Sequence, residues 1–209
     1  MKTIINVLKV VLAFVIAALV VVLTLTALKP WMDRWGSRPE EISMALPGDE
    51  LLLEPAGVYT RSITINASPQ QIFAWLVQIG AEKGGWYSYT LLENMVGCKI
   101  TNSDRIHPEW QLLKPGDKVK MCPGESGPPA YTVAQITPDQ TMVMGHKENG
   151  KWVNVWMFNL VPQSDGTTRL ISRTRTMAVE GFWRIFHPIT FVMERGMLMG
   201  IRQRAEASQ

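Results

Sequence analysis

The chain has 209 residues, a formal net charge of +3 at pH 7 and 46% hydrophobic residues. Lys2, Lys9 and Lys29 account for the positive excess, because the part beyond Pro30 is neutral, with 18 basic and 18 acidic residues. That part has no block of basic residues, which excludes nucleic acid as the main partner, since phosphate binding needs concentrated positive charge.

The first element is an uncharged apolar run over residues 10–28, interrupted only by Thr24 and Thr26. At about 1.5 Å per residue it would form a helix of about 28 Å, close to the thickness of the hydrocarbon core of a bilayer. A secretory signal peptide is the competing interpretation, but its apolar region is shorter, and Thr24-Leu25-Thr26 is a poor cleavage site. We predict that residues 1–29 are a retained, single-pass membrane anchor that contacts the bilayer through residues 4–28.

The flanking charges barely decide which way this helix crosses the membrane. Lys2 and Lys9 precede it, and Lys29, Arg34 and Arg38 follow it, so the positive-inside rule nearly cancels. The very short N-terminal tail is typical of a signal anchor, which favours a domain on the extracytoplasmic side.

Residues 30–56 are expected to connect this anchor to a domain over residues 57–209. Trp31 and Trp35 stand where interfacial aromatic residues are common. A short helix is expected over residues 38–46. A long helix is not expected, because helix-breaking residues interrupt the segment at Pro30, Pro39, Pro47, Gly48 and Pro55.

The domain begins with a predicted strand over residues 58–66, followed by a helix that Ser68 caps and Pro69 opens. Gly80 is expected to end this helix, because glycine accepts the left-handed conformation of a C-terminal cap. Apolar residues recur in the helix at i, i+3, i+4 and i+7, which makes one helical stripe of Ile72, Trp75, Leu76 and Ile79.

An aromatic loop follows the helix. Gly84 and Gly85 give the backbone freedom just before Trp86, Tyr87 and Tyr89, three large rings that each carry a polar group.

A second short helix is expected after this loop. Thr90 and Glu93 have the spacing of a capping box. Leu91, Leu92 and Met95 form the apolar side of the helix.

The run WLVQIG, GGWYSYTLLEN and a final glycine, from Trp75 to Gly97, resembles the START-like ligand-binding superfamily. This superfamily is also called SRPBCC or polyketide cyclase/dehydrase-like, and it includes the major birch pollen allergen. The likeness covers residues 47–207, with Trp35-Gly36 and Leu46-Pro-Gly-Asp-Glu50 ahead of it. It implies an α+β helix-grip fold, in which a curved antiparallel sheet wraps around a long C-terminal helix with an apolar cavity between them. The family binds lipids, sterols, polyketides and other hydrophobic molecules, and only some members catalyse a reaction.

Turn signals divide the next part of the chain into an antiparallel meander. The pair Asn149-Gly150 is favoured in hairpins. Strands are expected over residues 118–121, 130–136, 141–146, 151–161 and 168–178.

The last two of these strands differ in pattern. Residues 152–161 are apolar on nearly both faces, so both sides should be covered. In the last strand, Arg169, Ile171, Arg173 and Arg175 share one face, which we interpret as a solvated outer surface.

A long helix is expected from Phe182 to about Ala205, with Pro188 at its start or at a kink. Its inner stripe, over the sheet, recurs at steps of four and three through Phe182, Phe186, Ile189, Met193, Gly196 and Gly200. Each glycine costs helix stability by about 1 kcal/mol relative to alanine. The glycines either leave room for a ligand or allow close packing, and the sequence supports both explanations equally.

Cys98 and Cys122 lack the spacing of a redox or zinc motif. Two partly buried thiols are the favoured interpretation. A single disulfide is the alternative, and it would need an oxidising compartment.

The sequence contains no nucleotide-binding, zincin or serine-hydrolase motif, and its histidines lack metal-ligand spacing. We therefore expect no cofactor and no metal. One polar cluster, Asp104, Arg105, His107 and Glu109, with Glu93 upstream, places a histidine near carboxylates. A loop held together by ion pairs is the ordinary explanation, and no catalytic residue is assigned.

We expect the domain to bind a hydrophobic small molecule or lipid in an internal cavity without transforming it. Glu93, Arg105 and His107 are candidates for orienting the polar part of the ligand. The other candidate ligand-binding residues are Trp86, Tyr87, Tyr89, Trp156, Met193, Gly196, Met197 and Gly200.

Two other functions stay open. A cyclase-, dehydrase- or hydrolase-type enzyme would need an acid–base pair inside the cavity. A membrane-tethered interaction domain would lack an apolar cavity. The sequence leaves the oligomeric state open.

Overall fold

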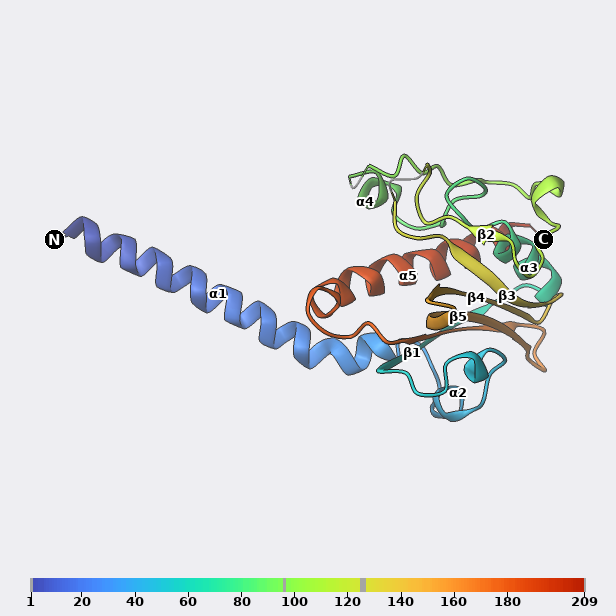
Figure 1. Cartoon of the computed structure of the whole chain (residues 1–209), viewed down its shortest axis with the longest axis horizontal. Helices are drawn as coiled ribbons and strands as arrows, with labels where there is room; N and C mark the ends of the chain where they lie inside the picture. Colours follow the sequence, from blue (N-terminus) through green and yellow to red (C-terminus); the bar gives the residue numbers. More distant parts are fainter. Residues whose placement is uncertain (1, 96, 125–126, 209) are drawn as a thin grey trace.

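The computed structural model describes residues 2–95, 97–124 and 127–208. Helix α1 (Lys2–Asp33) projects as a long rod from one side of the domain (Figure 1). Helix α5 (Phe182–Ala207) packs against a six-stranded antiparallel sheet with the strand order β1-β6-β5-β4-β3-β2. The expected α+β helix-grip fold, preceded by an apolar N-terminal helix, is confirmed.

The strands lie close to their predicted positions. They are β1 (Gly57–Ile65), β2 (Lys118–Val119), β3 (Tyr131–Thr137), β4 (Thr141–Glu148), β5 (Lys151–Pro162) and β6 (Thr168–Thr176). The short helical elements are α2 (Pro39–Ser43), η1 (Asp49–Leu51), α3 (Pro69–Val77), α4 (Thr90–Met95) and η2 (Pro108–Trp110).

Local signals set the ends of α3. The Ser68 hydroxyl accepts the backbone N–H of Gln71 at 3.3 Å, and the Gln71 side chain accepts the N–H of Ser68 at 2.9 Å. The predicted cap therefore begins the helix. The helix ends at Val77, earlier than the predicted Ile79, and Gly80 follows with a positive φ of 129°.

The meander and its buried strand also follow the sequence. Asn149 and Gly150, between β4 and β5, have φ values of 50° and 81°, which the favoured two-residue hairpin turn requires. Residues 155–160 of β5 are all buried, so the prediction that both faces of this strand are covered is confirmed.

Helix α1 does not stop at Pro30 but continues to Asp33. Contacts with the domain hold this last turn, because Asp33 pairs with His187 of α5 at 2.7 Å, and the rings of Trp31 and Phe191 lie 5.2 Å apart. These contacts compensate for the hydrogen bond that a proline cannot make. The helix is long and apolar enough over Val11–Asp33 to cross a membrane, by length and composition.

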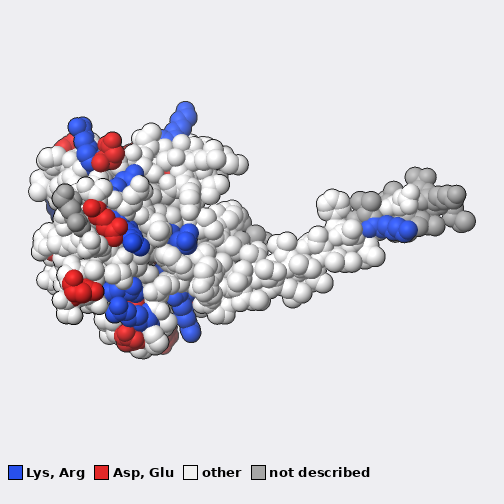
Figure 2. Space-filling model, turned by 180° about the vertical axis from the view of Figure 1, so that it is seen from behind, with Lys and Arg blue, Asp and Glu red and all other residues white. Residues whose placement is uncertain are grey.

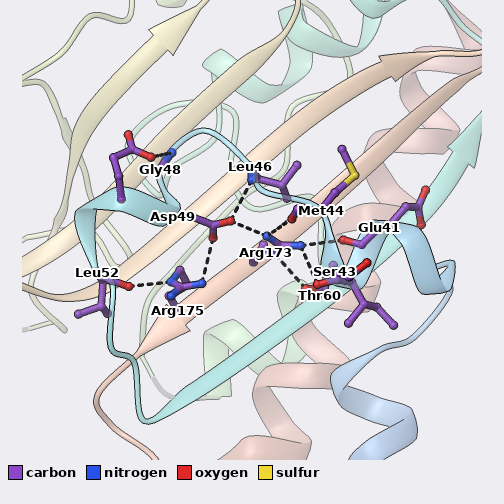
Figure 3. A network of polar contacts seen from close by, with 12 residues as sticks. Glu41, Ser43, Met44, Leu46, Gly48, Asp49, Leu52, Thr60, Arg173 and Arg175 are labelled. Carbon is purple, nitrogen blue, oxygen red and sulfur yellow. Dashed lines mark hydrogen bonds and ion pairs between the residues drawn. The ribbon is translucent and has the colours of Figure 1, made fainter.

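The segment predicted as a connector lies across the outer face of the sheet and covers the arginines of β6 (Figure 3). Arg169 and Arg173 are only 6% and 2% exposed. The interpretation of this face as a solvated surface is therefore wrong. The alternation of β6 is right, but alternation does not show which distant segment covers a face.

Charged hydrogen bonds join this segment to the sheet. Arg173 donates to the Asp49 carboxylate at 2.6 Å and to the backbone carbonyl of Glu41 at 2.7 Å. Arg175 donates to the other oxygen of Asp49 at 3.2 Å, and Arg169 binds both carboxylate oxygens of Glu41 at 2.7 and 2.6 Å. Burial alone would raise the pKa of Glu41, but the hydrogen bonds from Arg169 outweigh it and hold the pKa below its ordinary value.

An apolar cluster also forms under this segment, where Leu46 packs against Val143, Val155, Met157 and Ile171. The segment is thus part of the packed structure. The division of the chain at residues 29 and 56 stays a prediction.

Helix α5 is packed on two sides. Its sheet side buries Phe191, Leu198, Ile201 and Ala205. The predicted inner stripe is partly wrong, because Ile189 is 49% exposed, and Gly196 and Gly200 contact the aromatic loop. The side chain of Phe182 lies outside the described part. A step pattern finds buried positions but does not separate two packed sides of one helix.

Cys98 and Cys122 form a disulfide, with their Cα atoms 4.9 Å apart. The favoured interpretation of two thiols is therefore wrong. The bond ties the loop after α4 to the loop after β2, two segments whose proximity no sequence spacing revealed.

Candidate functional site

The aromatic loop contacts α5 at the two helix glycines. A Cβ atom added at Gly200 would lie 2.0 Å from the carbonyl oxygen of Tyr87, and one added at Gly196 would lie 2.7 Å from the Tyr89 ring. The glycines therefore allow a close approach that no other residue would permit without movement. Of the two explanations that the sequence left open, close packing accounts for both glycines.

Polar contacts hold the loop in this position. Asn102 accepts the N–H of Tyr87 at 2.8 Å and donates to the carbonyl of Ser88 at 3.1 Å, and the Ser88 hydroxyl donates to the carbonyl of Met193 at 2.8 Å. The fully buried Gln78 donates to the Tyr87 hydroxyl at 2.9 Å. Burial raises the pKa of Tyr87 to about 12, so this hydroxyl stays protonated at neutral pH.

A groove of about 600 Å³ runs along the contact between this loop and α5. Tyr89 and Met199 are 44% and 39% exposed, and the guanidinium of Arg204 lies 4.7 Å from the centre of the Tyr87 ring. The groove thus combines apolar walls with positive charge, which suits a molecule with an apolar body and an acceptor-rich head. Its lining includes Tyr87, Tyr89, Gly196, Met199, Gly200 and Arg204.

Met199 and Arg204 were missed by the sequence analysis. Met199 stands three residues after Gly196, and Arg204 stands four residues after Gly200. Helical spacing from the two glycines could have found both residues, because residues three and four apart share a helix face.

Trp86, Trp156 and Met197 lie deeper, in the main hydrophobic core. They are 6%, 8% and 1% exposed. The rings of Trp86 and Trp156 stack with centroids 5.9 Å apart, and the Trp86 indole donates to the carbonyl of Met121 at 3.2 Å. In the described part of the chain these residues pack against one another beneath the loop.

A chain of buried polar groups links the sheet to α5, and the sequence analysis missed it. The Trp156 indole donates to the Ser172 hydroxyl at 2.8 Å, and Ser172 donates to Glu194 at 2.7 Å. Arg61, 1% exposed, pairs with the other oxygen of Glu194, and its Nη2 has no hydrogen-bond partner among the described residues. Burial and the Glu194 carboxylate raise the pKa of Tyr131 to about 12.

The sequence carried a signal for this chain of groups. Arg61 shares a strand face with Ile63 and Ile65, and Glu194 stands in the middle of the apolar part of α5. A charged residue on each of two buried faces predicts that the two pair, since buried charges need partners.

Glu93 is the buried residue of α4, at 7% exposure, and its two carboxylate oxygens have no hydrogen-bond partner among the described residues. Burial raises the pKa of Glu93 above its ordinary value. Thr90 is the first residue of the helix, not its cap. The capping-box prediction is therefore wrong, because a capping box would engage the Glu93 carboxylate.

Arg105 and His107 lie in a neighbouring loop. His107 Nε2 is 2.9 Å from the Ser103 hydroxyl, and Nδ1 is 3.2 Å from the Glu109 carboxylate. The Arg105 side chain is exposed, and its carbonyl accepts a hydrogen bond from Gln78 at 3.1 Å. These contacts are those of a loop held together by its own polar groups. Within the described part of the chain, no three His, Cys, Asp or Glu side chains gather as metal ligands.

Comparisons with known proteins bear on the fold alone. No protein-family model and no curated protein matches the sequence. The Aha1 dimer from Colwellia psychrerythraea is similar in structure, with 17% identity and a TM-score of 0.46 over 73% of this chain and 98% of that chain. CalC from Micromonospora echinospora, a self-sacrificing resistance protein, has 11% identity and a TM-score of 0.47 over 72% of this chain and 95% of that chain. Likeness at this level carries no information about a ligand.

Proposed function

We propose that this protein is a membrane-anchored START-like domain that binds a hydrophobic small molecule or lipid in the groove between the aromatic loop and α5. Tyr87, Tyr89, Gly196 and Gly200 are the predicted residues that contact the ligand there. Trp86, Trp156 and Met197 lie in the core beneath the groove, and Met193 contacts Ser88 of the loop. Their role as ligand contacts stays a prediction. The orienting role of Glu93, Arg105 and His107 stays a prediction.

The observation that carries this proposal is the exposure of apolar side chains beside positive charge in one groove. Tyr89 and Met199 present a ring and a thioether to solvent. Arg202, Arg204 and Glu206 line the same groove, and because Glu206 pairs with Arg202 at 3.0 Å, Arg204 supplies the positive charge. Covering apolar area stabilises a complex by about 25 cal/mol per Å², and a few polar groups suffice to orient the ligand. A molecule with an apolar body and an anionic or carbonyl head fits this lining.

The anchor is part of the proposal. The exposed apolar helix over Val11–Asp33 supports a single pass through a membrane. The disulfide between Cys98 and Cys122 supports a domain in an oxidising compartment. The disulfide favours an extracytoplasmic domain, and a single-pass anchor is compatible with one.

Native mass spectrometry of the full-length protein, purified from host membranes, tests the groove. We expect a bound apolar molecule on the wild type and a several-fold smaller bound fraction on Tyr89→Ala and Met199→Ser. Leu53→Ala is the matched control, because Leu53 is also exposed, at 75%, but lies outside the groove lining. Equal occupancy in all four proteins would refute the groove as the site. Absence of any bound apolar molecule would favour an interaction domain.

A hydrolase-type enzyme is the second candidate, because Ser103, His107 and Glu109 stand in the order of a nucleophile, a base and an orienting acid. The Ser103 hydroxyl also donates to the Arg105 carbonyl at 3.0 Å, and its single proton serves only one acceptor at a time. Hydrolysis of a p-nitrophenyl ester by the wild type that Ser103→Ala abolishes would establish the enzyme.

A further inference from the structure

Helix α4 exposes its apolar side and buries its acidic residue, which is the opposite of what is expected of a surface helix in water. Leu91, Leu92 and Met95 are 74%, 41% and 75% exposed, whereas Glu93 is buried. The exposed Asn94 has its amide engaged, donating to the carbonyl of Ile100 at 3.1 Å and accepting its N–H at 2.6 Å. The helix therefore presents apolar side chains outward and keeps its polar groups inward or paired, as expected of a helix that faces hydrocarbon.

The first half of α5 continues this apolar exposure. His187 is buried against Asp33, whereas the apolar side chains of Ile189 and Val192 are exposed. The exposed large apolar residues of α4 and of the first half of α5 are Leu91, Leu92, Met95, Trp183, Ile189 and Val192. We call these six residues the apolar face. Exposed large apolar side chains gathered on one side of a domain mark an interaction surface.

Figure 1 shows the first turns of α5 next to α1, and α4 on the same left-hand side of the domain but farther from α1, at the top of the view. The apolar face therefore lies on the side of the domain from which α1 emerges. The end of the domain next to α1 is also largely uncharged in the view from behind (Figure 2). Trp31 and Trp35 both contact Phe191 of α5, with ring centroids 5.2 and 6.4 Å apart. These contacts fix the orientation of the domain relative to α1.

We infer that the apolar face inserts into the surface of the bilayer that α1 crosses, as a second membrane contact. The inference rests on the proposed membrane anchor. A bilayer is the occupant that the structure favours, since a helix crossing it would bring its surface to this side of the domain. Tyr89 directly precedes α4, so the same contact brings one end of the ligand groove to the lipid surface. An apolar ligand could then pass between bilayer and groove without crossing water.

Site-directed fluorescence on the full chain tests this inference. The two native cysteines are paired, so Leu91→Cys and Met95→Cys each introduce one reactive thiol for an environment-sensitive nitrobenzoxadiazole label. The matched control is Leu112→Cys, which is 84% exposed and follows η2, the yellow-green segment at the end of the domain away from α1 (Figure 1). Each labelled protein is reconstituted into phosphatidylcholine vesicles with plain or brominated acyl chains.

We expect blue-shifted emission at positions 91 and 95 and a loss of fluorescence with brominated lipid, with neither change at position 112. Quenching at 91 and 95 no greater than at 112 overturns the inference. A blue shift without quenching also overturns it, because the face would then be covered by protein. Retention of the protein on vesicles after an alkaline wash separates the two proposals. If the protein is washed off, the anchor is refuted and this inference with it; if it stays while the labels remain in water, only the second contact is refuted.

Discussion

Helix α5 covers one side of the sheet and the segment 39–52 covers the outer side, and the two sides differ in how their buried charged groups are paired. On the outer side, Arg169 and Arg173 find carboxylates and carbonyls at 2.6 to 2.7 Å. On the side of α5, Arg61 Nη2 and both oxygens of Glu93 have no hydrogen-bond partner among the described residues.

This difference separates a structural region from a candidate functional one. A buried network in which each charge has partners fixes one packing of its segments. A buried polar atom without a partner costs free energy, so its presence needs another reason, such as a ligand, a proton or a changed environment. We call the contacts of Arg169, Arg173 and Arg175 with Glu41 and Asp49 the outer network. The outer network holds residues 39–52 on the sheet, and the α5 side is where binding should be sought.

The largest expected effect comes from breaking the outer network. Arg173→Ala would leave Asp49 and the carbonyl of Glu41 without their main donor inside a covered face. Removing one partner of a buried ion pair costs about 3–5 kcal/mol. We expect a corresponding loss in the free energy of unfolding of the full chain in detergent, followed by chemical denaturation.

The control for Arg173→Ala is Lys120→Ala, which removes an exposed pair with Glu82 at 2.7 Å. Such a pair contributes about 1 kcal/mol or less. If Arg173→Ala fails to fold, Arg175→Ala gives a milder test, because Arg175 shares Asp49 but is 16% exposed. Equal effects of Arg175→Ala and Lys120→Ala would contradict a structural role for the outer network.

A middle-sized effect is expected at the two helix glycines, which define the floor of the groove. Gly200→Ala would place its Cβ against the backbone of Tyr87, whereas Gly196→Ala would meet the end of the Tyr89 side chain. Overpacking costs about 1–3 kcal/mol, partly offset by about 1 kcal/mol of helix propensity. We expect Gly200→Ala to lower the melting temperature clearly and Gly196→Ala to lower it little.

The glycine pair is its own control, because both substitutions add one methyl group to the same helix. A ring can rotate away from an added methyl group, and a backbone carbonyl cannot without moving its segment. Equal melting temperatures of the two variants would mean that the loop does not pack on α5 as the structure shows.

The sequence predicted features that depend on neighbouring residues. Ser68 predicted the start of α3, and Asn149-Gly150 predicted the turn between β4 and β5, because helix caps and tight turns depend on residues that are close in the sequence. It failed where contacts join distant segments. Arg173 and Glu41 meet across 132 positions, and Cys98 and Cys122 across 24. No periodicity within one element carries such information.

The candidate site was predictable in part for the same reason. Tyr87, Tyr89, Gly196 and Gly200 were each named as ligand-binding candidates, and the structure brings the two rings and the two glycines together. Their role in binding stays a prediction. Whether a ring lines a groove, as Tyr89 does, or fills the core, as Trp156 does, depends on what the fold places against it. Apolar character is the same in both cases, so the sequence could not separate them.

The smallest effect, and the most direct contrast between the two regions, is the response of Glu93 and Glu41 to pH. Glu93 has a raised pKa because it is buried without a partner. The folded state therefore holds its proton more tightly than the unfolded state, and the wild type loses stability as the pH rises from the ordinary glutamate value of 4.5 through the raised pKa. Glu41 has a lowered pKa, so its contribution is present above 4.5 and is lost as the pH falls through the lowered value.

Glu93→Gln removes the buried charge while keeping the size of the side chain. We expect it to raise the free energy of unfolding at neutral pH by about 1 kcal/mol, the lower range for an unsatisfied buried group. The gain should vanish below pH 4.5, where Glu93 is protonated in both states. Glu41→Gln is the matched control with the opposite sign, because it loses the charge that Arg169 requires and is less stable than the wild type at neutral pH. Chemical denaturation of the three proteins between acidic and neutral pH measures both differences. A Glu93→Gln variant that is less stable than the wild type at neutral pH would mean that this carboxylate has a partner in the folded protein, and the contrast between the two regions would fail.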